Sequence, residues 1–63
     1  MKMMTALVRK ENGNLRVVRD DYFKTQKEFA EELRSNGFKV LKIWSKEISD
    51  EAVYEWEFLN RKH

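Results

Sequence analysis

Two short stretches near the start of the chain are rich in hydrophobic residues, with polar residues at their ends. They cover residues 3–10 (MMTALVRK) and 15–20 (LRVVRD), and Glu11-Asn12-Gly13-Asn14 lies between them. Asn-Gly is the strongest short hairpin signal, because a two-residue type I′ turn needs positive φ at both central residues. We therefore predict a β-hairpin with Asn12 and Gly13 at its turn.

This turn fixes which residues of the hairpin share a face. It places Val8 opposite Val17 and Leu7 opposite Val18. The expected core face then carries the apolar set Met4, Ala6, Val8, Leu15 and Val17, and the other face carries Thr5, Leu7, Arg9, Arg16 and Val18. Since successive side chains alternate between faces, a slip of one residue would exchange the two sets.

The next segment has the start and stop signals of a helix. Thr25-Gln26-Lys27-Glu28 is a capping box, in which the Thr25 hydroxyl accepts from the Glu28 N–H and the Glu28 carboxylate reaches back. An apolar stripe follows, and Gly37 supplies the left-handed residue that ends many helices, with Phe38 as the hydrophobic contact behind it. We predict a helix over about residues 25–36, with Phe29, Ala30 and Leu33 facing the core.

The remaining third contains one clear strand and one ambiguous segment. Residues 38–44 (FKVLKIW) are rich in β-forming side chains, and residues 45–50 (SKEISD) resemble a turn. In 51–59 (EAVYEWEFL), strand spacing puts Ala52, Tyr54, Trp56 and Phe58 on one face. Helix spacing instead gathers Ile48, Ala52, Trp56 and Leu59 and leaves Tyr54 and Phe58 facing water. The alternation and the aromatic residues favour a strand.

The predicted fold is a small α+β domain of order ββαββ, with a mostly antiparallel sheet and the helix at 25–36 packed on one face. The alternative is ββαβα with a C-terminal helix. Sixty-three residues suffice for one domain, which we place at residues 1–63. A single helix covers only one side of a four-stranded sheet, so we expect the other side to be open to a partner.

Charge is distributed unevenly along the chain. Residues 1–19 hold five Lys or Arg side chains against one acid, whereas residues 45–60 hold five acids against one Lys, although the net charge is only +2. Such polarity suits an anionic partner or a second copy of the chain. The chain has no Cys and no apolar run long enough for a secretory signal or a membrane span, so we expect a cytoplasmic protein.

Side chains suited to catalysis are scarce. The single histidine is His63, there is no Cys nucleophile, and both glycines are assigned to turns rather than to a phosphate-binding loop. We therefore expect no enzyme activity, no catalytic residue, no metal site and no cofactor.

The surface features instead favour binding, and we single out Arg9, Arg16, Lys42 and Trp44 as partner-binding candidates. In the predicted register Arg9 and Arg16 face each other, and such repulsion is tolerable where both cations serve an anionic partner; the alternative is that they extend into water or meet a neighbouring glutamate. Lys42 and Trp44 belong to a stretch that interleaves lysines with aromatics, as base-stacking surfaces do, but core packing explains the same stretch.

We expect a non-enzymatic module for protein–protein interaction, self-association included, acting through an exposed sheet face or edge. The alternative is nucleic-acid binding by the basic hairpin, because an Arg-bearing two-stranded ribbon fits the major groove. Its supporting cations would be Lys2, Lys10, Arg19, Lys42, Arg61 and Lys62.

Overall fold

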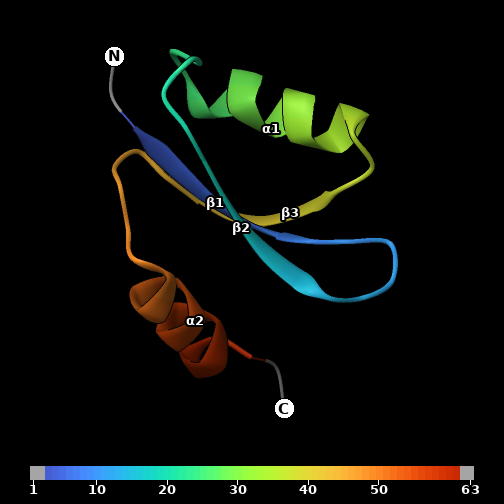
Figure 1. Cartoon of the computed structure of the whole chain (residues 1–63), viewed down its shortest axis with the longest axis vertical. Helices are drawn as coiled ribbons and strands as arrows, with labels where there is room; N and C mark the ends of the chain where they lie inside the picture. The colour runs from blue at the N-terminus through green and yellow to red at the C-terminus, as the bar shows by residue number, and fades with distance from the viewer. Residues whose placement is uncertain (1–2, 62–63) are drawn as a thin grey trace.

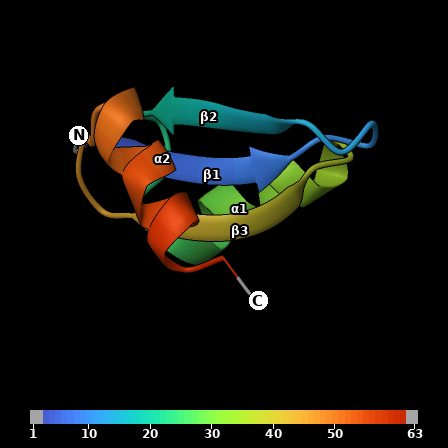
Figure 2. The ribbon, with the colours of Figure 1, turned by 90° about the horizontal axis from the view of Figure 1, so that it is seen from below.

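Three antiparallel strands form a sheet that carries one helix on each face (Figures 1 and 2). The computed structural model describes residues 3–61, so Lys2, Lys62 and His63 lie outside it. The elements in chain order are β1 (Met4–Arg9), β2 (Leu15–Asp20), α1 (Gln26–Ser35), β3 (Lys39–Trp44) and α2 (Asp50–Leu59). The central strand is β1, which pairs with β2 on one side and β3 on the other.

The β1–β2 hairpin forms as predicted, but its register is one residue away from the predicted one. Leu7, not Val8, lies opposite Val17. The loop has three residues: the Lys10 N–H donates to the Asn14 carbonyl at 2.8 Å, and Gly13 alone takes a positive φ, of 90°. This loop needs a positive φ at one residue only, whereas the predicted type I′ turn needs a positive φ at Asn12 as well as at Gly13.

The one-residue shift leaves the faces of β1 as predicted and exchanges those of β2. Met4, Ala6 and Val8 face α1, as expected, and pack with Phe29 and Leu33. From β2, however, it is Val18 that joins this core. The predicted core residues Leu15 and Val17 lie on the opposite face, across from Arg9 and Leu7.

Helix α1 confirms both of its predicted end signals. The Thr25 hydroxyl accepts from the Glu28 N–H at 3.2 Å, and the Glu28 carboxylate reaches back as predicted, although it accepts from the Lys24 N–H and not from the Thr25 N–H of an ideal capping box. At the other end the Gly37 and Phe38 N–H groups donate to the Arg34 and Leu33 carbonyls, the bonds of a Schellman motif. Gly37 has φ of 88°, as this motif requires.

An irregularity in β3 allows one strand to serve both faces of the sheet. Ile43 pairs with Ala6 and Val40 with Val8, although two residues lie between Val40 and Ile43 and only one lies between Ala6 and Val8. The extra residue is a β-bulge, which keeps Ile43 and Val40 together in the core under α1. Leu41 turns toward the other face, where it lines a hollow with Trp56.

The segment at 51–59 is a helix, so the predicted fourth strand is wrong and the element order is that of the ββαβα alternative. The Ser49 hydroxyl caps α2 by accepting from the Ala52 N–H at 3.2 Å, and Asp50 and Glu51 favour the positive end of the helix dipole. Only Val53 of α2 is fully buried.

Helix α2 lies across the sheet face that the sequence predicts to be open (Figure 2). Leu7 on that face is fully buried, and the Trp44 and Trp56 rings meet edge to face with centroids 5.7 Å apart. A strand at 51–59 would have left Leu7 without a cover, which is why the helix is favoured. Within residues 3–61 neither helix is long and apolar enough to cross a membrane.

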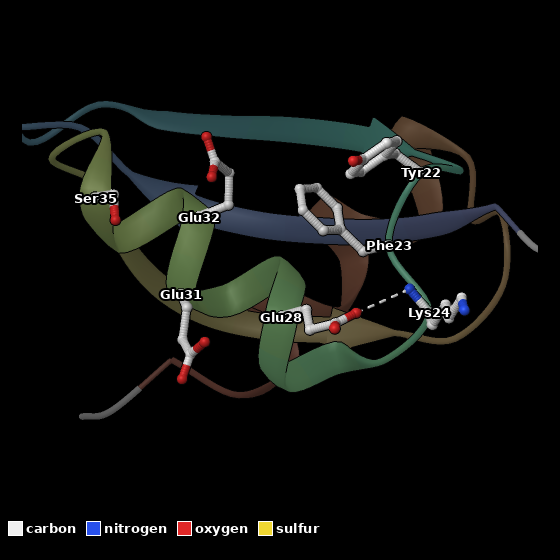
Figure 3. A pocket seen from close by; sticks show the side chains of 7 residues that line it. All are labelled: Tyr22, Phe23, Lys24, Glu28, Glu31, Glu32 and Ser35. Carbon is white, nitrogen blue, oxygen red and sulfur yellow. Dashed lines mark hydrogen bonds between the residues drawn. The ribbon is translucent and has the colours of Figure 1, made fainter.

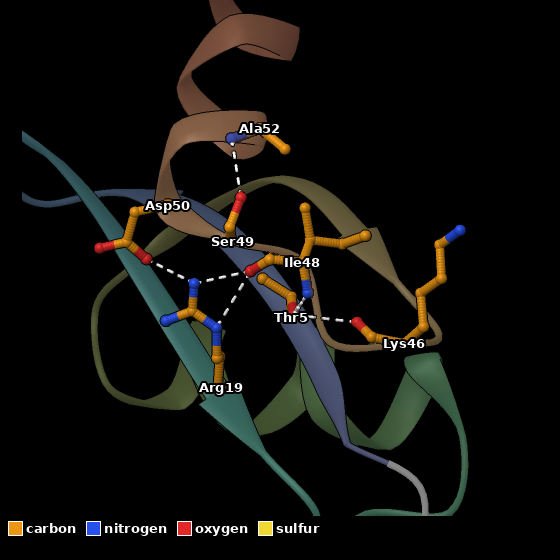
Figure 4. Close-up of polar contacts among 7 residues, drawn as sticks. All are labelled: Thr5, Arg19, Lys46, Ile48, Ser49, Asp50 and Ala52. Carbon is orange, nitrogen blue, oxygen red and sulfur yellow. Dashed lines mark hydrogen bonds and ion pairs between the residues drawn. The ribbon is translucent and has the colours of Figure 1, made fainter.

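Two side chains fix the connection from β3 to α2 against the sheet (Figure 4). The fully buried Thr5 hydroxyl accepts from the Ile48 N–H and donates to the Lys46 carbonyl, both at 2.9 Å. Arg19 donates twice to the Ile48 carbonyl and forms an ion pair with Asp50. These bonds set where α2 begins and therefore which of its faces points away from the sheet.

Candidate functional site

The structure separates Arg9 and Arg16. Because Arg9 lies opposite Leu15 and Arg16 opposite Val8, the two arginines are on opposite faces of the sheet, which corrects the predicted pair. Arg16 is exposed on the α1 side. Arg9 is half-buried on the α2 side and donates to the Gly13 carbonyl at 2.8 Å. The two side chains therefore do not repel each other across the hairpin, and this pair no longer indicates an anionic partner.

Lys42 and Trp44 lie on the α2 side of the sheet, as Arg9 does. The Lys42 ammonium is 5.9 Å from the centre of the Trp44 ring, a cation–π distance. Trp44 is half-buried and meets Trp56 edge to face, so much of it serves to hold α2 on the sheet.

Basic side chains gather where the hairpin meets the C-terminal half of α2. Arg9, Lys10 and Arg61 line a hollow of about 720 Å³ together with Tyr54 and Glu57. Arg61 donates to both carboxylate oxygens of Glu57, with a shorter contact of 2.7 Å. That hydrogen-bonded pair holds the pKa of Glu57 below its ordinary value, and the charge of Arg9 adds to the effect.

The outward face of α2, which we define as Glu51, Tyr54, Glu55, Phe58 and Leu59, is the most unusual surface of the protein. Tyr54, Phe58 and Leu59 are 43%, 65% and 70% exposed. Glu51 and Glu55 lie between these apolar side chains on the helix surface. An ordinary surface helix is polar on its outer side, so a helix with large apolar residues on both sides lacks a cover.

The helical alternative for residues 51–59 already predicts part of this surface, although the sequence analysis favours a strand. The helical alternative leaves Tyr54 and Phe58 facing water, as the structure shows. It also places Leu59 inward, which the structure corrects. Ser49, followed by two acids, is the start signal that separates the two alternatives.

A second hollow, of about 480 Å³, runs along α1 on the side of β2 (Figure 3). Its side chains already have structural roles: Glu28 accepts from the Lys24 N–H, and Phe23 stacks on Phe29 at 5.5 Å. Glu31 points away from the aromatic residues (Figure 3). Tyr22 is 72% exposed at the edge of this hollow, on the α1 side of the sheet (Figure 3).

The part of the chain that the structure describes contains no group of three or more His, Asp or Glu side chains placed to hold a metal ion. No protein family model, characterised protein or solved structure shows significant similarity to this chain. Its function is therefore inferred from the chemistry of its own surfaces.

Proposed function

We propose that the chain is a non-enzymatic protein-binding module that docks through the outward face of α2. One observation carries this proposal: α2 exposes Tyr54, Phe58 and Leu59, while it fully buries only Val53. The sheet face that the sequence analysis expects to bind a partner is occupied by α2 itself. We therefore assign the docking surface to α2, the helix that covers this sheet face, and not to the sheet itself.

The energetic argument rests on apolar area left in water. Complete burial of a large apolar side chain stabilises a complex by roughly 1.5–3 kcal/mol. Phe58 is held in place, because the Arg61 guanidinium lies 5.5 Å from its ring centre and is itself fixed by Glu57. Aromatic side chains with few rotatable bonds lose little entropy on binding, and they are frequent at the centres of interfaces.

Charge limits the kind of partner. Glu51 and Glu55 accompany the apolar residues on this face. A matching surface therefore combines apolar side chains with at least one cation, since an uncompensated carboxylate in a contact is costly.

Site-specific photo-cross-linking tests this proposal. A benzophenone side chain in place of Phe58 or Tyr54 should give one discrete adduct in cells that express the protein, with itself or with another protein. The matched control is the same group at Tyr22, which is more exposed than either residue but lies beside α1, on the other side of the sheet from α2 (Figure 3). The adduct at position 58 should disappear when Tyr54 is replaced by Ala. Equal labelling at position 22, or no adduct at 54 and 58, would refute it.

Nucleic-acid binding is the second candidate function, favoured by the gathering of Arg9, Lys10 and Arg61 around one hollow beside Tyr54. Cations that follow a backbone next to an aromatic ring suit a single strand. Fluorescence anisotropy with labelled single-stranded and duplex DNA should show affinity that falls steeply with salt. Lys10→Ala should weaken binding more than Lys27→Ala, which removes the same charge from α1. No binding at low ionic strength would exclude this function.

A further inference from the structure

We propose that the partner on the outward face of α2 is a second copy of this chain, with the two α2 helices packed antiparallel. The inference rests on the proposed function and names its partner. Tyr54 of each copy would contact the partner's Phe58, and Glu51 of each copy would contact the partner's Arg61.

The spacing along α2 produces a stripe suited to helix pairing. Glu51, Tyr54 and Phe58 stand at positions i, i+3 and i+7, the repeat of a coiled-coil seam. This stripe faces away from the side of the helix that carries Val53 and Trp56. Arg61 follows the helix, yet its guanidinium lies over the Phe58 ring and so extends the same stripe.

The order of chemistry along the stripe makes it self-complementary in one orientation only. From the N-terminal end the stripe presents an acid, two aromatic rings and a base. In an antiparallel pair, Tyr54 contacts the partner's Phe58 and Glu51 contacts the partner's Arg61. A two-fold axis relates the two copies, so each contact is made twice. Both contacts are centred midway between Tyr54 and Phe58, so one register satisfies them. A parallel pair would place acid against acid and base against base.

Arg61 retains a donor for this contact. Its Nε and Nη2 atoms bond to Glu57, at 3.3 and 2.7 Å, and its Nη1 makes no hydrogen bond within residues 3–61. A guanidinium has five N–H donors in one plane, so it can hold two carboxylates at once. Glu57 would thus orient Arg61 toward the partner's Glu51.

Two features limit the strength of the pair. A ten-residue helix is about 15 Å long, so the contact buries less than the roughly 1,200 Å² of a stable complex. Glu55 flanks the stripe near the two-fold axis, where it would approach the partner's Glu55. We therefore expect a weak dimer, with a dissociation constant on the order of 0.1 mM.

Sedimentation equilibrium from about 10 μM to 2 mM should show the mass rise from 7.7 kDa toward twice that value. Phe58→Ala should weaken association at least about tenfold. Tyr22→Ala, which removes an exposed aromatic ring on the other side of the sheet, should have no effect. Glu55→Gln should strengthen association, because it removes a like-charge contact.

The sharpest test is a charge exchange. Glu51→Arg and Arg61→Glu should each weaken association about fivefold or more, and the double variant should restore it. Both Arg61→Glu and the double variant lose the local bond to Glu57, so restoration reports the contact between copies.

The outcomes separate this inference from the proposed function. A monomer at 2 mM would overturn the pairing, and the proposed function would still stand if position 58 cross-links to a different protein. If the chain associates but neither Phe58→Ala nor the charge-exchange variants change its dissociation constant, the assignment of the contact to α2 is wrong. Absence of both association and cross-linking would overturn the two together.

Discussion

Replacing Thr5 with valine removes one buried hydroxyl that holds the β3–α2 connection against the sheet. That hydroxyl accepts from the Ile48 N–H and donates to the Lys46 carbonyl, both at 2.9 Å (Figure 4). Valine has nearly the same shape, so the backbone groups of residues 46 and 48 would lose their partner without gaining space for water. The position of α2 depends on this connection.

The expected cost follows from the two lost bonds. Each contributes about 1 kcal/mol net, and a buried group left without a partner costs at least as much. We expect Thr5→Val to lower the free energy of unfolding by about 2 kcal/mol. A domain of this size changes its melting temperature by roughly 4–8 °C per kcal/mol, which gives a drop of about 8–16 °C.

Urea unfolding followed by tryptophan fluorescence measures this change, because Trp44 and Trp56 both lie at the α2–sheet contact. A protein concentration of a few micromolar keeps the chain monomeric. The control is Thr5→Ser, which keeps the hydroxyl and loses one methyl group, worth about 1 kcal/mol. Unchanged stability of Thr5→Val, or a larger loss in Thr5→Ser, would refute the role of this hydroxyl.

Three further changes test other parts of the structure. Val53→Ala removes two methyl groups from a fully buried site and should cost about 2–3 kcal/mol by urea unfolding, whereas the exposed Leu59→Ala should cost less than about 0.5 kcal/mol. Arg61→Gln should raise the pKa of Glu57 toward its ordinary value, seen by NMR titration of its carboxyl carbon. Because the pKa of Glu57 is lowered in the folded state, the Glu57–Arg61 pair stabilises the wild type at pH values above the ordinary pKa of a glutamate. This stabilisation is lost as the pH falls through the lowered pKa of the folded protein. Between these two pKa values, the free energy of unfolding of Arg61→Gln should therefore depend less on pH than that of the wild type. Gly13→Ala should cost about 1 kcal/mol through its positive φ alone, since an added Cβ meets no atom within 4 Å, and Gly13→Asn should cost less in the same urea unfolding assay.

Helix α1 shows which features the sequence predicts well. Its boundaries depend on bonds between residues three to five apart, from the capping side chain of Thr25 to the left-handed Gly37. Such contacts are complete within the segment, so the local sequence contains the whole signal. The predicted range and its three buried residues are confirmed.

The hairpin register shows where a local signal is incomplete. Asn12-Gly13 fits a two-residue turn and equally fits a three-residue loop that ends in a left-handed glycine. The choice depends on long-range burial: the observed register puts Val18 under α1 and Leu7 beside Val17 on the α2 side. The candidate pair of arginines failed for the same reason, since a shift of one residue moved one of them to the other face.

Helix α2 illustrates a conflict between pattern and tertiary structure. In the stretch Tyr54, Trp56 and Phe58 every second residue is aromatic, which is typical of a strand. In a helix, however, two residues that are two positions apart lie on opposite sides, so Trp56 lies opposite Tyr54 and Phe58. Trp56 packs on the sheet, and the other two face outward. The need to cover Leu7 decides between the alternatives, and that need is visible only once the sheet is assembled.

The most direct test of the docking surface is an isotope-filtered NOE experiment on a mixture of labelled and unlabelled protein at about 1 mM, a concentration above the expected dissociation constant. We predict contacts between copies that connect the Tyr54 ring to the Phe58 ring, with none to Tyr22. Contacts between copies that map to α1 or β2, with Tyr54 and Phe58 silent, would contradict the account.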